Sequence, residues 1–323
     1  MHTKEIILSY LSANLAGRLA AVSADFFETV TELRIRVDKP LLIYSLNQEY
    51  GLPPESPVLP EASVQGEAVL LSDVRKGYRP DFSDIAETVE RISQYSLYAL
   101  EEELRMGYIT LPGGHRVGVV GKAVLENRLI RTIRPISGLN IRICRAVRGC
   151  GDNVLPRILD NAAEPAACGR LPHNTMIISP PGCGKTTLLR DIIRQLSDNC
   201  GLTVGVVDER SEIGGSYKGV AQNDVGMRTD LLDGCPKAEG MMLLLRAMAP
   251  DVIAVDELGG DDDIAAVENV SNAGIRLLCT VHGYSIEDIR QKPGLRALLG
   301  KGIFKRFVVL AAPGKEAEIY DSD

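Results

Sequence analysis

The sequence predicts an α/β fold, with a parallel sheet flanked by helices in the C-terminal half and a smaller α+β domain before it. Three observations lead to this expectation. From residue 174 onward, short runs rich in Val and Ile alternate with helical patterns, as in parallel sheets covered on both faces. A glycine-rich turn follows the first of these runs. The earlier residues instead combine helical patterns with stretches of alternating polarity, which are typical of hairpins.

The chain has 323 residues, enough for about two domains. We expect an α+β domain over 1–145, an interdomain linker over 146–173 and the parallel-sheet domain over 174–323. Residues 1–30 are expected to be helical, because leucine and isoleucine recur there at helical spacing. A long helix is expected over 84–107, ending at a C-cap glycine. Hairpin turns are expected at 113–114 and near 127.

Composition limits the classes of function. The chain carries 36 Lys and Arg against 43 Asp and Glu, a net charge of −7, which argues against non-specific nucleic-acid binding. Seven cysteines without a CxxC pair, and only four histidines, disfavour a disulfide scaffold or a structural zinc site. A reducing cytoplasm is therefore expected. The sequence contains no apolar run of about 18 residues, so any membrane association is expected to go through a partner.

The first run leads into "IISPPGCGKTTLLRD", residues 177–191, which has the form of a phosphate-binding loop. Its two glycines let the backbone close around phosphate, and the following helix N-terminus supplies N–H donors. Lys185 is expected to reach the β- and γ-phosphates of ATP, and the Thr186 hydroxyl to bind Mg²⁺. The predicted nucleotide-binding residues are Pro181, Gly182, Cys183, Gly184, Lys185, Thr186 and Thr187.

Two positions in this loop are unusual. Ser179 stands where the pattern normally begins with glycine, at the strand exit and before the phosphates are reached. Cys183 lies between the glycines and near a helix N-terminus, where the pKa of a thiol tends to fall. We interpret Cys183 either as a redox-sensitive position or as a small side chain that fits the loop.

The segment "APDVIAVDELGG" is an apolar strand that ends in Asp256 and Glu257. Asp256 is expected to hold the Mg²⁺ shell, and Glu257 to orient and deprotonate the attacking water. A glutamate directly after this aspartate is more typical of hydrolases than of kinases. The spacing from the phosphate-binding loop fits an ATPase core with an added strand.

Two other strand ends should face the loop, because parallel strands release their carboxyl ends on one edge of the sheet. "VGVVDERSEIGG" places Asp208 and Glu209 there, either to assist the metal and water or as a solvated turn. "LLCTVHGYS" ends with Thr280 and His282, and His282 is either a sensor of the γ-phosphate or a structural residue. Seven arginines are candidates for stabilising the developing charge: Arg131, Arg134, Arg142, Arg145, Arg210, Arg228 and Arg246.

In this order, "PPGCGKTT", "VVDERSEI", "PDVIAVDELGG" and "CTVHGYS" resemble the Walker A loop, acidic box, Walker B strand and histidine box of the secretion-ATPase superfamily. "ELRIRVDKPL", "GGHRVGVVG" and "ISGLNIRI" extend a closer resemblance, to the stage III sporulation AA family of endospore-forming bacteria, over nearly the whole chain. The resemblance implies a RecA-like P-loop ATPase core. It implies Glu257, Lys185, Glu209 and His282 as catalytic residues, and Thr186 and Asp256 as metal ligands.

The resemblance further implies a Mg²⁺-dependent ATPase on the mother-cell side, forming hexameric rings. It would power or gate a transport channel between mother cell and forespore, with integral membrane proteins as partners and no nucleic acid. We also class the chain with AAA ring ATPases. Two alternatives stay open, namely a nucleic-acid-dependent RecA-like motor and a nucleotide-gated assembly scaffold with weak hydrolysis. Stimulation by single strands would favour the first.

Overall fold

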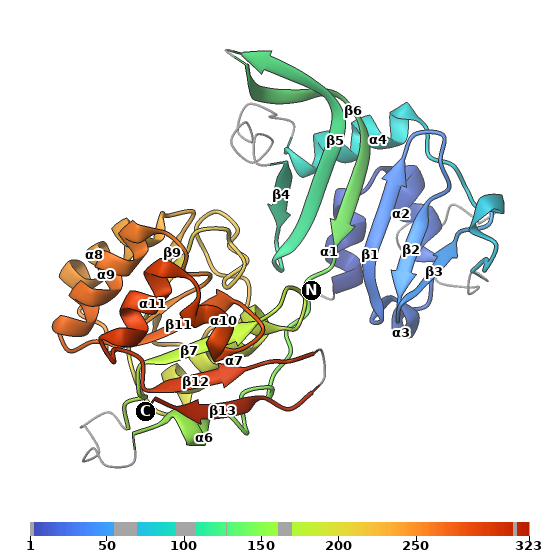
Figure 1. Ribbon diagram of the computed structural model, residues 1–323. Coiled ribbons are helices and arrows are strands. Elements are labelled where there is room, and N and C mark those ends of the chain that lie inside the picture. The colour runs from blue at the N-terminus through green and yellow to red at the C-terminus, as the bar shows by residue number, and fades with distance from the viewer. Residues whose placement is uncertain are drawn as a thin grey trace. The chain divides into compact units, whose positions relative to one another are not determined.

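The computed structural model describes residues 3–54, 70–94, 107–126, 128–160, 170–312 and 315–322. The chain forms two compact units, unit 1 over Met1–Arg145 and unit 2 over Ala146–Asp323 (Figure 1). Each unit has its own sheet, with one hydrophobic core in unit 1 and a core on each face of the sheet in unit 2. The two units are therefore described separately.

Unit 1 begins with three short helices in place of one continuous helix: α1 (Thr3–Tyr10), α2 (Ala13–Ala20) and α3 (Ala24–Phe27). The interruptions follow from two serines that act as N-caps. The hydroxyl of Ser12 accepts the backbone N–H of Leu15, and Ser23 does the same for Phe26. Buried Ser12 also donates to Asp84 Oδ1 at 3.0 Å, which ties these helices to α4 (Phe82–Ile92).

The sheet of unit 1 is antiparallel, with strand order β3-β2-β1-β6-β5-β4 (Figure 1). The expected turn at 113–114 joins β4 to β5, and a further hairpin joins β5 to β6. The second half of the expected helix over 84–107 lies outside the described residues. A short 3₁₀ helix over Val74–Lys76 follows the strands β1 (Val30–Arg36), β2 (Leu42–Ser45) and β3 (Gln48–Gly51), and the later strands are β4 (Tyr108–Leu111), β5 (His115–Glu126) and β6 (Leu129–Arg142).

The sheet of unit 2 has the order β13-β12-β7-β11-β10-β8-β9, parallel except for β13 (Figure 1). The predicted fold class is confirmed as a RecA-like core, in which β11 is inserted between β7 and β10. That order brings the ends of β7, β11, β10 and β8 side by side on one edge. The strands are β7 (Thr175–Ser179), β8 (Val204–Asp208), β9 (Thr229–Asp233), β10 (Val252–Val255), β11 (Arg276–His282), β12 (Arg306–Val309) and β13 (Glu318–Asp321).

Both faces of this sheet are covered, because alternate side chains of each strand enter different cores. On β7, Met176 and Ile178 enter one core, and Ile177 enters the other. The first core includes residues of α8, α9, α10 and α11, and the second includes residues of α6 and α7. The helices are α6 (Leu155–Ile158), α7 (Lys185–Asp198), α8 (Lys237–Ala247), α9 (Asp261–Asn272), α10 (Ile286–Arg290) and α11 (Pro293–Gly300).

Residues 146–173, expected as a linker, belong to unit 2 over their described part. The backbone N–H of Gly151 donates to Asp191 Oδ2 of α7 at 2.8 Å. Burial alone would raise the pKa of Asp191, but hydrogen bonds from Gly151, Arg194 and Gln195 hold it below its ordinary value. The segment is thus fixed to the helix that follows the phosphate-binding loop.

Candidate nucleotide site

The expected phosphate-binding loop spans residues 180–184, between the end of β7 and the start of α7. Gly182 and Gly184 have φ values of +78° and +88°, in the left-handed region that favours glycine. A Cβ added at either position would meet nothing within 4 Å, so the outer surface of the loop is open. Gly184 directly precedes α7, whose first N–H groups have no side-chain cap. The loop therefore presents free backbone donors at a helix N-terminus, as anion sites do.

Asp256 is the point where the loop meets the neighbouring strands. The hydroxyl of Thr186 donates to Asp256 Oδ2 at 2.9 Å, and Lys185 Nζ lies 3.7 Å from Oδ1. The Thr280 hydroxyl, at the end of β11, donates to the same Oδ1. Lys185 is 8% exposed although it carries a charge, and this carboxylate is its partner. The structure thus brings Lys185, Thr186 and Asp256 together.

Glu257 has an unusual backbone and a fully engaged side chain. Its φ is +59°, which costs a non-glycine residue about 1–2 kcal/mol. Its N–H donates to Thr280 Oγ1 at 2.9 Å, and this bond helps to hold the turn. Carboxylate Oε2 accepts from Arg210 Nη1 at 2.9 Å, and Oε1 pairs with His282 Nε2. The strained turn therefore aims Glu257 at the edge of the sheet, where two donors hold it.

Thr280 is named in the sequence analysis as part of a strand end, but it is not among the predicted catalytic, nucleotide-binding or metal-binding residues. Its side chain is fully buried, and its single hydroxyl donates to Asp256 and accepts from Glu257. This sets the two acidic residues relative to each other. Its position two residues before His282 on one strand places both on the same face, and that spacing could have identified it.

The two residues of the acidic box have different surroundings. Asp208 is buried and accepts the backbone N–H groups of Glu212, Ile213 and Gly214 at 2.7–3.0 Å. Burial raises the pKa of Asp208, although these hydrogen bonds oppose the rise. Glu209 instead pairs with Lys237 of α8, and both Asp208 and Glu209 line one small cleft with Asp256 and Glu257. The two residues therefore differ in their partners: Asp208 binds the backbone of its own loop, whereas Glu209 binds the side chain of another element.

Of the candidate arginines, Arg210 lies at the site, through its bond to Glu257. Arg145 binds Glu28 and backbone carbonyls within unit 1. Arg228 donates to the Ser197 carbonyl, and Arg246 donates to a carbonyl of its own helix. Arg145, Arg228 and Arg246 are therefore each bound by residues of their own unit.

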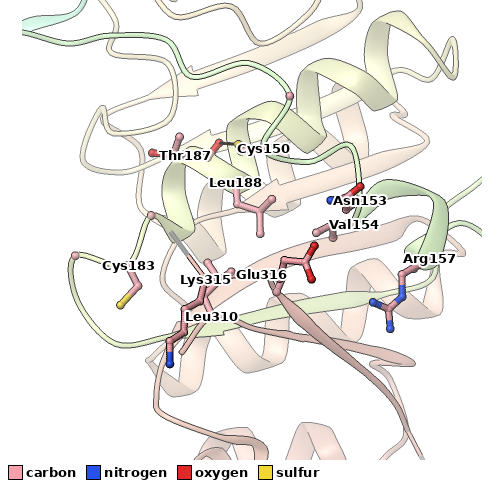
Figure 2. Close-up of a pocket in the computed structure, with 14 residues that line it drawn as sticks. Cys150, Asn153, Val154, Arg157, Cys183, Thr187, Leu188, Leu310, Lys315 and Glu316 are labelled. Atoms are coloured by element: carbon pink, nitrogen blue, oxygen red, sulfur yellow. Dashed lines mark hydrogen bonds between the residues drawn. The ribbon is translucent and has the colours of Figure 1, made fainter. Parts of the chain in front are cut away.

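A pocket of about 510 Å³ opens beside the loop (Figure 2). Gly182, Cys183 and Thr187 form one side of it, and Cys183 Sγ is 3.9 Å from the carbonyl of Pro181. Figure 2 shows side chains from separate segments of unit 2 around the pocket. Its apolar floor consists of the buried residues Val154, Leu188 and Leu310, and exposed polar side chains form its rim. The remaining lining residues named in the figure are Cys150, Asn153, Arg157, Lys315 and Glu316.

The donors at the loop fit Mg²⁺ held in a complex with phosphate. Mg²⁺ in such sites usually takes one or two protein oxygens, and phosphate and water supply the rest. Thr186 and Asp256 provide such oxygens, 2.9 Å apart. Within the described ranges, no cluster of three or more His, Cys, Asp or Glu side chains is arranged to hold a metal by itself.

The model of the family described as "Sporulation stage III, protein AA" matches residues 1–323. Among curated proteins, stage III sporulation protein AA of Bacillus subtilis (strain 168) is 36% identical over 324 residues, covering 98% of this chain and 95% of that protein. Similarity on this scale extends over both units.

Solved structures with a similar fold include an ATPase and a pilus retraction motor. The Legionella pneumophila ATPase DotB is similar with a TM-score of 0.51 and 12% identity, over 87% of this chain and 72% of DotB. The pilus retraction motor PilT with bound ADP gives 0.53 and 13%, over 91% and 79%. These likenesses support the fold. AAA proteins are a different class of ATPase from these structures, so our expectation that the chain belongs with the AAA ring ATPases is wrong.

Across the part of the chain that the structure describes, no helix has the length and apolar character needed to cross a membrane.

Proposed function

This chain belongs to the sporulation stage III protein AA family, and from that premise we propose that unit 2 is a Mg²⁺-dependent ATPase that drives a membrane-associated complex during sporulation. One observation carries the proposal: Lys185, Thr186, Asp256 and Glu257 converge on one sheet edge beside an open glycine loop. A protein that only binds nucleotide would need the loop and Lys185. Hydrolysis also needs a base for the attacking water, and Glu257, which follows Asp256 on a strained turn, can supply it.

We propose that Lys185 binds the phosphates of ATP and that Thr186 binds the metal ion. Lys185 lies directly after the loop, and its ammonium is 3.7 Å from Asp256 Oδ1, where it could reach the phosphates of ATP. The Thr186 hydroxyl and the Asp256 carboxylate, which are hydrogen-bonded at 2.9 Å, would hold Mg²⁺ between the protein and the phosphates. Bound Mg²⁺ supplies charge neutralisation on the phosphate oxygens. The backbone N–H groups after Gly182 add donors that need no reorganisation.

Glu257 is proposed as the general base, with Glu209 and His282 beside it. Arg210 and His282 each contact one carboxylate oxygen of Glu257, and because each oxygen can accept a second hydrogen bond, a water can reach Glu257 with both contacts in place. Loss of either contact would make the carboxylate a stronger base. Arrival of negative phosphate gives each of the two side chains an alternative partner. Arg210 or His282 would then move toward the phosphates and release Glu257 to take the proton from water.

The pocket beside the loop is proposed to hold the nucleoside part of ATP. The pocket adjoins Gly184 and Thr187, beside which the phosphate nearest the nucleoside would lie. Its floor includes Val154, Leu188 and Leu310. An apolar floor with a polar rim suits a base and a ribose. Cys183 lies on its wall, so we propose that this cysteine serves as a small lining residue.

At the larger scale, we propose a hexameric ring that powers or gates a channel between mother cell and forespore, with integral membrane proteins of that complex as partners. It would act in the cytoplasm on the mother-cell side. Membership in a sporulation family and the secretion-type fold support this. The test is light scattering with and without ATP and Mg²⁺, with turnover measured on the same samples. Ring assembly with turnover that rises steeply with protein concentration is expected, and turnover without assembly would contradict the ring.

A further inference from the structure

The hairpin of β5 and β6 extends beyond the rest of the unit 1 sheet (Figure 1). β4 pairs with residues 115–118 of β5, and β1 pairs with residues 138–142 of β6. Among the described strands, the parts beyond these positions pair only with each other. We call residues 120–137 the projecting hairpin. At its base, Ile133 and Ile136 pack against the core of unit 1, and the Val37 N–H donates to the Ser137 carbonyl at 3.0 Å. Residues 120–126 and 130–131, toward the tip, are exposed.

The projecting hairpin concentrates exposed apolar side chains. Val120 is 58% exposed, Leu125 62% and Ile130 45%, and Val124 is also exposed. Leu125 and Ile130 are directly opposite in the register, so they share a face near the end of the hairpin. Single exposed apolar residues are common on protein surfaces, but four within one short projection indicate a contact surface.

The same segment is basic, in a chain that is acidic overall. It contains Lys122, Arg128, Arg131 and Arg134, and Glu126 is its one acidic residue. The whole chain, in contrast, has 36 basic and 43 acidic residues. Glu126 lies 3.6 Å from Arg131 and offsets one of the cations. The positive charge is thus gathered on the projection that also carries the apolar side chains.

We propose that the projecting hairpin binds the surface of an anionic lipid bilayer. Positive charge complements the anionic headgroups, and apolar side chains between the cations enter the boundary with the acyl chains. A protein partner that approaches from one side would leave the other face exposed, whereas a lipid interface surrounds a projecting tip. Three irregularities in the β5–β6 register and the charged edges disfavour strand addition by a partner.

The depth of this contact is limited by the backbone. The open edges carry N–H and C=O groups that need water or another partner, so the hairpin cannot enter the hydrocarbon core. It would lie in the hydrated headgroup region, with Leu125 and Ile130 reaching deepest. The proposal depends on unit 1 alone, and its failure would leave the ATPase proposal for unit 2 untouched.

The experiment uses the full chain and sedimentation with vesicles. One set of vesicles mixes phosphatidylglycerol with phosphatidylcholine, and the other is phosphatidylcholine alone. The tip variant combines Leu125→Ser with Ile130→Ser. Its matched control is Leu46→Ser, which removes a 76% exposed leucine from the β2–β3 turn of the same unit. The charge variant combines Arg131→Gln with Arg134→Gln, and Lys39→Gln is its control.

The wild-type chain is expected to bind the anionic vesicles and to lose that binding at high salt. The tip variant should bind about tenfold more weakly or worse, because two large apolar side chains are lost. The charge variant should lose roughly fivefold per cation. The controls should bind as wild type, and thermal unfolding should be unchanged throughout, since all these side chains are exposed.

Two results would overturn the proposal. One is the absence of wild-type binding to the anionic vesicles. The other is a tip variant that binds as wild type, because the contact would then be a general effect of positive charge. A tip variant that keeps vesicle binding but loses self-association in light scattering would assign the hairpin to a second copy of the chain instead.

Discussion

The ends of β8 and β10 carry the same dipeptide, Asp-Glu, but the structure uses the two copies differently. Asp208 is buried and accepts three backbone N–H groups of its own loop. Asp256 instead accepts from Thr186 and Thr280 and lies near Lys185. One aspartate therefore fixes a fold, and the other gathers the side chains that a nucleotide would engage.

The two glutamates that follow differ in a related way. Glu209 pairs with Lys237 at the rim of the site. Glu257 is held by Arg210 and His282 on a backbone with positive φ. Strain at a position without a packing need favours a functional origin for the conformation. The partners of a carboxylate, more than its place in a motif, thus indicate whether it supports structure or chemistry.

The largest effect is expected from Lys185→Ala. Loss of the ammonium removes charge stabilisation at the phosphates, so turnover should fall by about 10²–10³. ATP binding should weaken as well, and both can be measured by phosphate release and by calorimetry. Lys301→Ala is the matched control, because it removes a lysine that is paired with Glu268, outside the residues that gather at the loop, and it should leave the turnover unchanged. Equal losses in both variants would contradict the role of Lys185 at the phosphates.

Asp208→Ala is expected to act on stability. It leaves three buried N–H groups without their acceptor, which should cost about 2–4 kcal/mol in the free energy of unfolding. Glu209→Ala, one residue later, breaks a partly exposed ion pair and should cost about 1 kcal/mol or less. Urea unfolding of both variants measures the difference. Equal costs would show that Asp208 does not have the structural role assigned to it.

Thr280→Val tests whether one hydroxyl couples Asp256 to Glu257. The substitution keeps the shape but removes the donor to Asp256 and the acceptor of the Glu257 N–H, so turnover should fall by about tenfold. Thr280→Ser should retain the hydroxyl and most of the rate. A Mg²⁺ titration of both variants adds a readout that a packing defect would not change. If the Thr280→Val variant reaches half-maximal turnover at the same Mg²⁺ concentration as Thr280→Ser, Thr280 does not couple Asp256 to Glu257.

The smallest effect concerns pH. Because burial raises the pKa of Asp208 above its ordinary value of 3.8, the folded chain holds this proton to a higher pH than the unfolded chain. The contribution of Asp208 to stability therefore falls as pH rises from that value through the folded pKa. Asp208→Asn removes this dependence, so the stability difference between wild type and variant should favour wild type more strongly in acid. An unchanged difference from acid to neutral pH would contradict the burial effect.

Much of unit 2 could be predicted from the sequence, because parallel strands are short apolar runs and their polar ends meet on one edge. The loop, Asp256, Glu257 and His282 follow from that pattern. β9 and β13 do not follow from it, because they are edge strands with partly exposed, polar side chains and lack such an apolar run. The helical spacing over 1–30 identifies side chains that are buried. The expected single helix is divided, however, because Ser12 and Ser23 each cap the start of a new helix.

Side-chain partners could not be predicted in the same way. Nothing in "VVDERSEI" distinguishes Asp208, which binds its own loop, from an acid that faces the nucleotide. The contact of Arg210 with Glu257 joins two strand ends 47 residues apart and depends on the strand order. The basic, apolar character of residues 120–137 is visible in the sequence. Its exposure is not, because the same alternation is compatible with a buried strand.

The most direct test of the central claim is phosphate release by wild type and Glu257→Gln, at one protein concentration with ATP and Mg²⁺, alongside ATP binding. The amide keeps the size and one acceptor oxygen, so it retains at most one of the contacts with Arg210 and His282, and it cannot accept the proton of water. We expect the variant to bind ATP like wild type and to release phosphate at least about 10²-fold more slowly. Hydrolysis by Glu257→Gln at the wild-type rate would contradict the assignment of Glu257 as the base.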